Sequence, residues 1–373
     1  MQRTVLIAAG GTGGHLFPAE ALASVLKARG WGVHLATDHR AEGYGADFPA
    51  VETHIIPSGT LAGAAMDRLD ALVRLASGFL RSAILLRRID AAAAVGFGGY
   101  PTLPPMLAAW FIGVPTVIHE QNAVLGRANR LLAPRVTAIG AATADLRLGP
   151  RDRAKITVTG NPVREAVRAL AGAPYPPAGP EGLFRLLVFG GSQGARFLSD
   201  LMPPAIEDLD IETRRRLSVT QQCRAEDVER VRTDYDKLGV RADLAPFFRD
   251  LPERIAASHL VVSRSGASTV AELAVIGRPA ILIPLPHALD DDQGANARMM
   301  QTAGGGWLMA QQDLTPERMA RELMRLIAQP EGLAKAAEAA RSIGRPDAAE
   351  RLADLVERRA ARRAASAARG TVT

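Results

Sequence analysis

The sequence predicts an α/β protein built from two doubly wound domains that face one another across a cleft. An apolar run at residues 4–9 leads into the glycine-rich residues 10–15 and then into a helical pattern at residues 18–28. The same order returns in the second half, where an apolar run at residues 183–189 leads into the glycine-rich residues 190–195. A strand, a glycine loop and a helix at the head of each half are typical of two similar parallel-sheet domains.

The composition is that of a globular protein with two cores. Hydrophobic residues make up 47% and charged residues 23% of the 373 residues. No stretch reaches the roughly 18 uninterrupted apolar residues that a spanning helix needs. The run at residues 4–9 is too short for a signal peptide, and we interpret it as the first strand. If the chain meets a membrane, we expect it to lie on the surface.

The cysteine content and the net charge restrict the compartment and the partners that the protein can have. The single cysteine, Cys223, excludes an intrachain disulfide and a cysteine-based metal cluster, which indicates a reducing compartment. A net charge of +6 is compatible with binding to nucleic acid, to an anionic membrane surface or to phosphorylated substrates. Aromatic residues are only 5%, without an aromatic-interleaved basic run, so nucleic acid is the weakest of these partners.

The first glycine loop, residues 10–15, only partly matches the dinucleotide-binding fingerprint. That fingerprint has a further glycine three positions after Gly13, where this chain has Leu16. Residues 33–37 follow as a second strand that ends at Asp38. A nicotinamide-binding protein therefore stays open as an alternative.

Residues 67–88 have apolar side chains at helical spacing, with arginines among them. One interpretation is a core-facing helix whose arginines are solvated. The other is an interfacial helix that dips apolar side chains into a bilayer while its arginines meet lipid phosphates. The candidates for such a docking surface are Leu72, Leu75, Phe79 and Leu80.

Polar residues follow the next predicted strands. Residues 92–95 lead into a second glycine loop at residues 96–100, and a helix is predicted at residues 104–112. A strand at residues 116–118 then delivers residues 119–122, His-Glu-Gln-Asn, at its carboxyl end. Open α/β sheets bind ligands at this edge, so we expect a site there.

The second half contains a strand–loop–helix–strand unit at residues 260–285. Ser268 and Thr269 can cap its helix, which carries Glu272 and ends near Gly277. The helix N-terminus would hold a diphosphate, and Glu272 would accept hydrogen bonds from ribose hydroxyls. The loop and the acid together indicate a nucleotide, and a plain crossover with a polar turn is the alternative.

Two features lie beyond this unit. Residues 290–292 are three adjacent aspartates, which favour either a metal ion or the N-terminus of a helix. A final amphipathic helix is predicted at residues 346–363, followed by a frayed tail.

Taken together, these pieces resemble the peptidoglycan-building members of glycosyltransferase family 28 over essentially the whole chain. The motifs that carry the resemblance are GGTGGH at residues 10–15, GFGGY at 96–100, HEQN at 119–122, GNPVR at 160–164, GGSQGA at 190–195 and SRSGASTVAE at 263–272. Two departures are Asp292, where the family has the first of two glutamines, and a changed sequence after the second glycine loop.

The resemblance implies the GT-B fold of two Rossmann-like domains and an inverting transfer of N-acetylglucosamine. The donor would be UDP-N-acetylglucosamine, and the acceptor the C4 hydroxyl of the MurNAc-pentapeptide of undecaprenyl-pyrophosphoryl lipid I, which becomes lipid II. No metal or other cofactor is implied. The protein would work at an anionic membrane surface, on the cytoplasmic face of the bacterial inner membrane.

The same resemblance divides the chain and assigns roles. Residues 1–162 would bind acceptor and membrane, residues 163–345 would bind UDP-N-acetylglucosamine, and residues 346–373 would form a helix that packs back on the N-terminal domain. The implied catalytic residues are His15 and Glu120. Donor-binding roles are implied for Thr12, Gly13, Gly14, Asn122, Arg164, Ser192, Gln193, Arg264, Ala267, Ser268, Thr269, Glu272 and Gln293, and acceptor-binding roles for Gly98, Gly99 and Tyr100.

The implied chemistry suits these residue types. Attack by a hydroxyl on the anomeric carbon needs a base, for which His15 and Glu120 are candidates, and neutralisation of the leaving UDP. Arg264 and the helix dipole would supply the second effect in place of a metal ion. Two alternatives from other classes remain: a UDP-sugar epimerase of the same fold, and a non-catalytic membrane scaffold.

Overall fold

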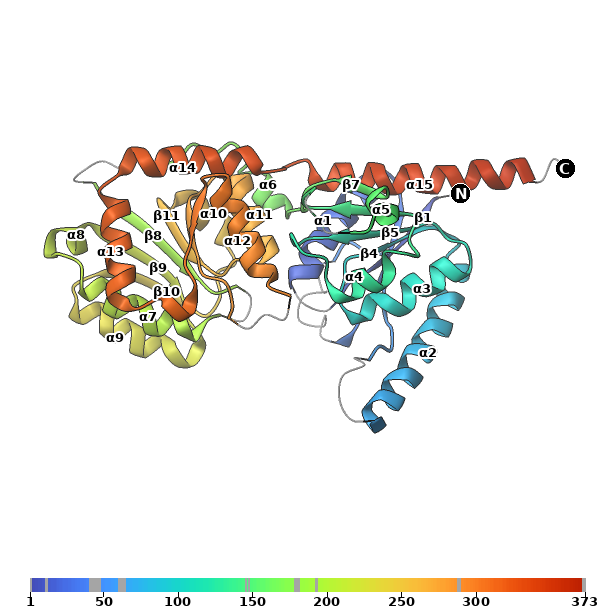
Figure 1. The fold of residues 1–373 in the computed structure, drawn as a ribbon, viewed down its shortest axis with the longest axis horizontal. Coiled ribbons are helices and arrows are strands. Elements are labelled where there is room, and N and C mark those ends of the chain that lie inside the picture. The colour runs from blue at the N-terminus through green and yellow to red at the C-terminus, as the bar shows by residue number, and fades with distance from the viewer. Residues whose placement is uncertain are drawn as a thin grey trace. The chain divides into compact units, whose positions relative to one another are not determined.

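The chain folds into two compact units. The computed structural model describes residues 2–10, 13–39, 48–59, 65–144, 146, 148–177, 182–191, 194–286 and 290–370, without the side chains of residues 65–69, 150 and 364–370. Unit 1 is Met1–Arg164 with Arg345–Thr373, and unit 2 is Glu165–Gly344 (Figure 1).

Unit 1 is built on a seven-stranded sheet. Its strands are β1 (Thr4–Ala8), β2 (Gly32–Thr37), β3 (Glu52–Ile55), β4 (Ala91–Gly96), β5 (Thr116–Glu120), β6 (Ala138–Ala141) and β7 (Ile156–Val158). The order is β3-β2-β1-β4-β5-β6-β7, and all of these neighbours pair in parallel. The order reverses between β1 and β4, which makes that point the switch point where such sheets bind ligands.

Helices cover both faces of this sheet. They are α1 (Gly13–Ala28), α2 (Ala65–Arg88), η2 (Tyr100–Thr102), α3 (Leu103–Phe111), α4 (Arg127–Leu132), α5 (Pro150–Arg153) and α15 (Ala348–Gly370). One buried cluster joins the sheet to α1 and α15, and the other joins it to α2, α3 and α4. Because side chains alternate along a strand, Leu35 belongs to the first cluster and Ala36 to the second.

The C-terminal helix α15 completes the core of unit 1. Leu352, Leu355 and Val356 are buried in the cluster that contains the α1 side chains. At its solvent side, Arg29 Nη1 lies 2.7 Å from an oxygen of Asp354. Figure 1 shows α15, in red, running alongside α1.

Unit 2 repeats the plan with six strands. They are β8 (Phe184–Phe189), β9 (Leu217–Gln222), β10 (Arg241–Ala245), β11 (Leu260–Ser263), β12 (Ala280–Leu282) and β13 (Gly306–Leu308), in the order β10-β9-β8-β11-β12-β13, again all parallel. Its helices are α6 (Glu165–Arg168), α7 (Arg196–Glu207), α8 (Ile211–Arg216), η3 (Ala225–Asp227), α9 (Val228–Lys237), α10 (Leu251–Ala257), α11 (Ala267–Ile276), α12 (Asp292–Thr302), η4 (Gln311–Asp313), α13 (Pro316–Ile327) and α14 (Pro330–Ile343). The switch point lies between β8 and β11. The predicted class of two doubly wound, Rossmann-like sheets is confirmed.

Two predicted helix starts were wrong. The first helix begins at Gly13 rather than at residue 18, so the end of the glycine loop is itself the first helical turn. In α11, Gly266 is the N-cap, with extended φ and ψ of −61° and 150°, and Ser268 and Thr269 lie inside the first turn. Glycine is an acceptable N-cap because the helix N–H groups can be satisfied by another partner.

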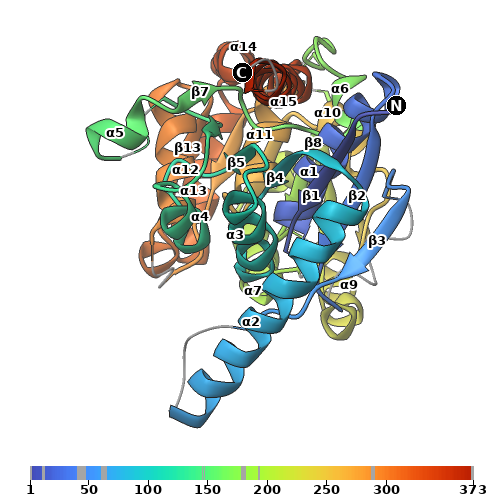
Figure 2. The same cartoon turned by 90° about the vertical axis from the view of Figure 1, so that its right-hand side faces the viewer.

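No helix among the described residues combines the length and the apolar character needed to cross a bilayer. The longest helix described in unit 1, α2, extends away from the sheet of that unit (Figure 2).

Candidate functional site

The two glycine loops of unit 1 meet at its switch point. Gly10, after β1, donates its N–H to the carbonyl of Gly98, after β4, over 3.2 Å. Gly98 and Gly99 have φ of 91° and 79°, a region that favours glycine. A Cβ on Gly99 would lie 3.3 Å from the Cα of Gly10, so the close approach of the loops also requires glycine.

His15 lies between these loops, in the first turn of α1. A Cβ on Gly98 would be 3.3 Å from its Nε2, and a Cβ on Gly10 would be 3.4 Å from its Nδ1. The imidazole is half-buried. Of its neighbours, Gly13 is buried and Gly14 is exposed, while Thr12 lies outside the described residues. The structure thus brings His15 to the predicted acceptor loop.

Glu120 is buried at the end of β5, and its carboxylate is surrounded by donors. Oε1 accepts from Asn122 N at 3.0 Å and Asn122 Nδ2 at 3.3 Å. Oε2 accepts from Gly126 N at 2.9 Å and Asn129 Nδ2 at 2.8 Å. Burial raises the pKa of Glu120, and these hydrogen bonds oppose the rise. The carboxylate therefore holds the β5–α4 loop and the start of α4 in place.

His119, the preceding residue, is fully buried on the other face of β5. Its Nε2 donates to the carbonyl of Gly160 over 2.9 Å, which fixes the proton on Nε2 because a carbonyl can only accept. Among the described residues its Nδ1 has no hydrogen-bond partner. Burial lowers the pKa of His119 to about 4, so the ring is neutral at pH 7.

The remaining residues that the sequence singled out in unit 1 also have defined contacts or burial. Gln121 joins β4 to β5, since its Nε2 donates to the carbonyls of Phe97 and His119. Tyr100 is half-buried at the start of η2. The Arg164 guanidinium lies 4.5 Å from the centre of the Phe17 ring, a cation–π contact within unit 1.

In unit 2, a glycine loop also follows the first strand. Gly190 donates its N–H to Gln222 Oε1 over 3.2 Å, which joins the loop to the end of β9. A Cβ on Gly190 would collide with the backbone of Gly194 and Ala195, so this turn also requires glycine. The predicted donor residues Ser192 and Gln193 lie outside the described residues.

Arg264, directly after β11, is a buried cation surrounded by neutral oxygens. Its Nη1 donates to the carbonyls of Ile283 and Pro284 at 3.2 Å, and its Nη2 to Gln311 Oε1 at 2.6 Å. Burial lowers the pKa of Arg264. In the part of the chain that the structure describes, no carboxylate pairs with it, so its positive field remains available to an anion.

The N-terminus of α11 lies beside Arg264 in the chain. Ala267, Ser268 and Thr269 form its half-buried first turn, whose backbone N–H groups have no intrahelical acceptor. Among the described residues, the buried Ser268 hydroxyl also has no hydrogen-bond partner. Glu272 is buried one turn further along the helix. This arrangement suits an anion with polar groups attached to it.

Contacts with α12 hold the Arg264 loop. Ser265 Oγ donates to the carbonyl of Gln293 over 2.8 Å, and Asn296 Nδ2 donates to the carbonyl of Ser265 over 3.1 Å. Gln293 Oε1 accepts from Leu285 N over 3.0 Å, so the predicted donor residue also has a structural contact.

The three aspartates lie at the start of α12. Asp291 is the N-cap, and its Oδ2 lies 2.6 Å from Arg298 Nη2. Asp292 Oδ1 accepts from Gln293 N over 2.9 Å. Asp291 and Asp292 thus make contacts at the start of the helix, where the helix dipole favours acidic residues.

Several residues at these sites were not foreseen. Asn129, Gln222 and Gln311 hold Glu120, Gly190 and Arg264 by hydrogen bonds between residues that are 9, 32 and 47 positions apart in the sequence. Arg224 lies against the glycine loop, since a Cβ on Gly194 would be 3.3 Å from its Cγ. No local pattern in the sequence identifies such long-range partners.

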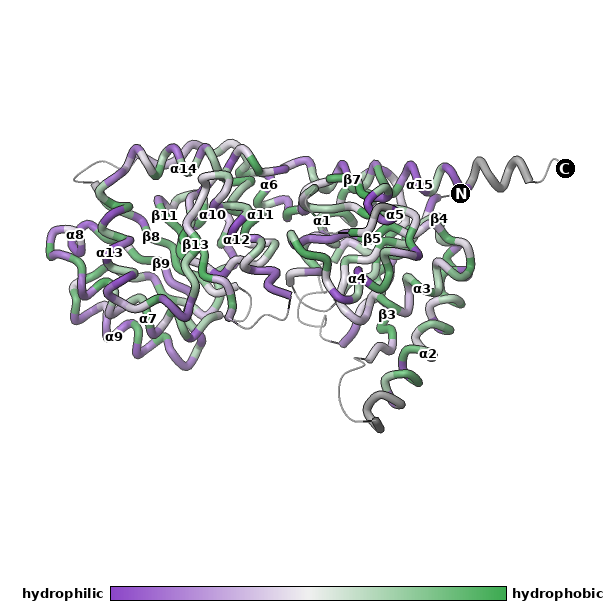
Figure 3. Tube along the Cα trace, in the orientation of Figure 1, coloured by the Kyte–Doolittle hydropathy of each residue, from purple (hydrophilic) through white to green (hydrophobic). Residues whose placement is uncertain are grey.

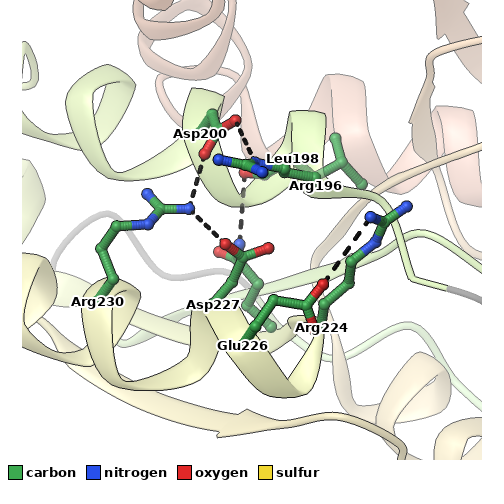
Figure 4. Close-up of polar contacts among 8 residues, drawn as sticks. Arg196, Leu198, Asp200, Arg224, Glu226, Asp227 and Arg230 are labelled. Atoms are coloured by element: carbon green, nitrogen blue, oxygen red, sulfur yellow. Dashed lines mark hydrogen bonds and ion pairs between the residues drawn. The ribbon is translucent and has the colours of Figure 1, made fainter.

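Figure 4 shows, next to this loop, the charged network that joins α7 to η3 and to the first turn of α9. Asp200 on α7 accepts from Arg230 at 2.7 Å and lies 3.6 Å from Arg196 Nε. Arg230 also donates to the buried Asp227 at 2.9 Å. Arg224 Nη1 is 4.0 Å from Glu226 Oε1, which is a long distance for an ion pair. The cation beside the loop is therefore only weakly paired.

Comparisons with known proteins agree over both units. The family model described as the glycosyltransferase family 28 N-terminal domain matches residues 5–141, and that of the C-terminal domain matches residues 185–352. A relative from Rhodopseudomonas palustris is 56% identical over 356 residues, which cover 95% of this chain and 97% of the relative. It is named UDP-N-acetylglucosamine--N-acetylmuramyl-(pentapeptide) pyrophosphoryl-undecaprenol N-acetylglucosamine transferase.

Solved structures share the fold. The crystal structure of Acinetobacter baumannii MurG matches with a TM-score of 0.79 and 26% identity, covering 95% of this chain and 99% of that one. A UDP-GlcNAc 2-epimerase from Neisseria meningitidis matches with a TM-score of 0.64 and 15% identity, covering 95% and 100%. At that identity the second likeness shows the fold alone.

Proposed function

This chain belongs to glycosyltransferase family 28, and we propose that it transfers N-acetylglucosamine from UDP-N-acetylglucosamine to the undecaprenyl-pyrophosphoryl N-acetylmuramyl-pentapeptide acceptor. It is an enzyme with the two Rossmann-like domains of the GT-B fold. Relatives at 54–56% identity over 95% of the chain carry the name of this reaction. Family membership replaces the nicotinamide alternative, and the epimerase likeness extends only to the fold.

The observation that carries the chemistry is the environment of Arg264. A buried guanidinium that has no carboxylate partner among the described residues, next to the N-terminal N–H groups of α11, favours a doubly charged leaving group such as UDP. We assign the diphosphate to Arg264 and to the first turn of α11, and the ribose to Glu272. Ser192, Gln193, Gln293 and Arg164 stay proposals for the rest of the donor.

Unit 1 supplies the acceptor side of the proposal. Gly98, Gly99 and Tyr100 would contact the acceptor, and Gly13, Gly14, Thr12 and Asn122 the donor sugar. His15 is the proposed base, because its half-buried imidazole lies against the Gly98 loop. Glu120 is buried with its oxygens hydrogen-bonded, so we now give it the role of a positioning residue.

The balance of the reaction follows from these roles. The acceptor C4 hydroxyl oxygen forms a bond to the anomeric carbon while the bond to the UDP oxygen breaks, with inversion of the anomeric centre. The hydroxyl proton passes to His15, and the negative charge that develops on UDP is stabilised by Arg264 and the α11 dipole. The chemistry requires no metal ion or other cofactor.

The test is incubation of the purified protein with UDP-N-acetylglucosamine, with and without a lipid I analogue. We expect UDP release and a disaccharide product only when the acceptor is present, and loss of both in His15→Gln. A new UDP-sugar formed without acceptor would make the protein an epimerase. Absence of any turnover with retained vesicle binding would make it a scaffold.

We also propose that α2 and α3 dock unit 1 on an anionic membrane, at the cytoplasmic face of the inner membrane. On α2, Leu80 is 62% and Ile84 66% exposed, and on α3, Phe111 is 71% exposed. Figure 3 shows hydrophobic residues along both helices. Val73, Leu80 and Ile84 lie within about 40° of one another around the α2 axis, so they form one stripe.

This surface refines the predicted docking residues. Leu72 is exposed, but Leu75 and Phe79 are half-buried, and the Phe79 ring packs edge-on against Phe111 at 5.7 Å. The exposed residues are therefore the better test. Each apolar side chain removed from water contributes about 1.5–3 kcal/mol, and each nearby arginine about 1 kcal/mol.

The membrane proposal is tested with the double variant Leu80→Ser/Ile84→Ser. We expect weaker binding to vesicles that contain anionic phospholipid and lower activity on a long-chain acceptor, with unchanged activity on a short-chain soluble acceptor. The matched control is Ile211→Ser in unit 2, whose side chain is 56% exposed. Equal vesicle binding by wild type and double variant would exclude this surface.

A further inference from the structure

A cluster of histidines and a glutamate lies at the edge of the unit 1 sheet, outside the residues assigned above. His34 is on β2, and Glu52 and His54 are on the edge strand β3. The parallel register pairs His34 with Glu52, and His54 lies two residues further along β3. Because side chains alternate along a strand, all three lie on the same face of the sheet.

These side chains are close enough to share a ligand. Each of the three side chains is of a type that binds metal ions, and each offers one ligand atom. Among the described residues, these three atoms all lie within 4.8 Å of one another. His34 Nδ1 is 3.1 Å from His54 Nε2, and Glu52 Oε1 is 3.6 Å from His54 Nδ1. The two imidazole planes are inclined by 16°, with their nitrogens facing one another.

Burial lowers the pKa of both His34 and His54. Both rings are therefore neutral at pH 7, and one shares its N–H proton with the lone pair of the other. Neutral imidazole is the form that binds a metal ion. On binding, the proton between the two rings moves to the other nitrogen of its own ring, so that both facing nitrogens offer a lone pair to the cation and both rings stay neutral.

The distances suit a tetrahedral ion. Two nitrogens bound to zinc at about 2.0–2.1 Å lie about 3.3 Å apart, so the observed 3.1 Å needs to open only slightly as the rings turn. Two histidines and one carboxylate complete three of the four positions, and solvent reaches the fourth because the Glu52 side chain is 54% exposed.

We propose that His34 Nδ1, His54 Nε2 and a carboxylate oxygen of Glu52 bind one divalent transition-metal ion, for which Zn²⁺ is the probe. The ion joins the edge strand β3 to β2. It has a structural role, because β2 separates β3 from β1 and its glycine loop. An edge strand of four residues has few hydrogen bonds to hold it, so such a link stabilises it.

Substitution of Arg88, the last residue of α2, provides a second test of the proposal. Its Nη2 lies 3.5 Å from Glu52 Oε2, so its charge competes with a cation for that carboxylate. Both side chains are more than half exposed, which limits the effect. Arg88→Gln therefore binds zinc more tightly than wild type, by a few-fold.

The experiment is a zinc titration of the full-length, tag-free protein, stripped of metal and desalted, in competition with a colorimetric zinc indicator. We expect one tight equivalent in wild type, at least about tenfold weaker binding in His34→Gln and His54→Gln, and tighter binding in Arg88→Gln. His39→Gln is the matched control and keeps wild-type affinity. Zinc should also raise the thermal unfolding temperature of wild type but not of His54→Gln.

A second measurement protects the test against variants that do not fold. X-ray absorption at the zinc edge of the loaded wild-type protein should show two imidazole ligands at about 2.0 Å. Absence of a saturable equivalent, unchanged affinity in both histidine variants, or a spectrum without imidazole would overturn the proposal and leave a hydrogen-bonded histidine pair only.

Discussion

Units 1 and 2 have the same strand order around their first strand, yet the strand ends hold opposite chemistry. In unit 1, the end of β5 carries a carboxylate whose oxygens accept from four donors of the same unit. In unit 2, the end of β11 carries a guanidinium whose hydrogen-bond acceptors among the described residues are all neutral oxygens, and it lies 5.5 Å from the centre of the Phe197 ring. The first group is satisfied internally, and the second leaves its charge for a ligand.

The comparison shows that the same fold can hold a buried charge in two ways, either paired with donors of the protein itself or available to a ligand. The topology decides where polar residues collect, at the carboxyl ends beside a switch point. Hydrogen-bond satisfaction then decides whether a residue positions a loop or binds a ligand. By this criterion we propose that Glu120 organises unit 1 and that Arg264 binds the donor in unit 2.

The largest effect is expected for Glu120→Ala. The substitution leaves the N–H groups of Asn122, Gly126 and Asn129 without their acceptor, and hydrogen bonds to a charged group contribute about 1.5–3 kcal/mol each. We expect the free energy of unfolding from urea titration to fall by about 4 kcal/mol or more. Transferase activity should fall with it.

Glu120→Gln distinguishes positioning from proton transfer. The amide keeps one acceptor oxygen but presents an NH₂ group to donors, so stability and activity should fall together. A variant that is as stable as wild type but has lost nearly all kcat would instead identify Glu120 as the base, and would remove the contrast with unit 2.

Arg264→Met should give the second-largest effect, confined to the donor. Loss of charge-assisted hydrogen bonds to a diphosphate should weaken UDP binding, measured by calorimetry, by about 100-fold. Stability should stay unchanged or rise, because an unpaired buried cation costs desolvation free energy. The matched control is the exposed Arg249→Met. Equal losses of donor and acceptor affinity would contradict the division between the units.

The sequence predicts much of this organisation because its signals are local. Glycine loops after apolar runs mark both switch points, and His119, Glu120 and Arg264 lie within two residues of the ends of predicted strands. The positions of these residues are therefore predictable from strand direction alone. The helical spacing of apolar residues at 67–88 likewise predicted α2, which spans Ala65–Arg88.

What the sequence could not supply depends on packing. Glu120 was predicted as a candidate base, and the proposal that it is a positioning residue depends on its hydrogen bonds to Gly126 and Asn129, which appear only in the folded structure. Leu75 and Phe79 are apolar like Leu80, and only the packing of α2 on α3 separates the half-buried residues from the exposed one. The His34–His54 pair depends on the register of β2 and β3, which no local pattern encodes.

A smaller effect is expected from the pH dependence of His119. Burial lowers its pKa in the folded state to about 4, whereas the unfolded chain titrates near 6.5. Between these values the unfolded state binds the proton first, so stability is full above about pH 6.5 and falls as the pH drops toward 4. The loss reaches about 3 kcal/mol, measured by urea unfolding at each pH.

His119→Gln isolates that contribution. Burial raises the pKa of Glu120, so its contribution to stability changes with pH in the opposite sense to that of His119, and the wild-type curve contains both groups. The amide of Gln can still donate to the Gly160 carbonyl but has no proton to gain. The stability difference between the two proteins should therefore shrink from pH 7 to pH 4. A difference independent of pH would contradict a neutral, buried His119.

The smallest effect on activity should come from a strong chelator. In the proposed mechanism Arg264 and the first turn of α11 offset the charge of leaving UDP, and Asp291 and Asp292 already contact Arg298 and the start of α12. Initial rates with and without the chelator should agree, while zinc-dependent thermal stability, a property of the β2–β3 edge, should be lost. Loss of transfer that Mg²⁺ or Mn²⁺ restores would contradict this assignment. It would move the stabilising charge in unit 2 from Arg264 to a cation, and the two units would then no longer differ in the way their buried charges are used.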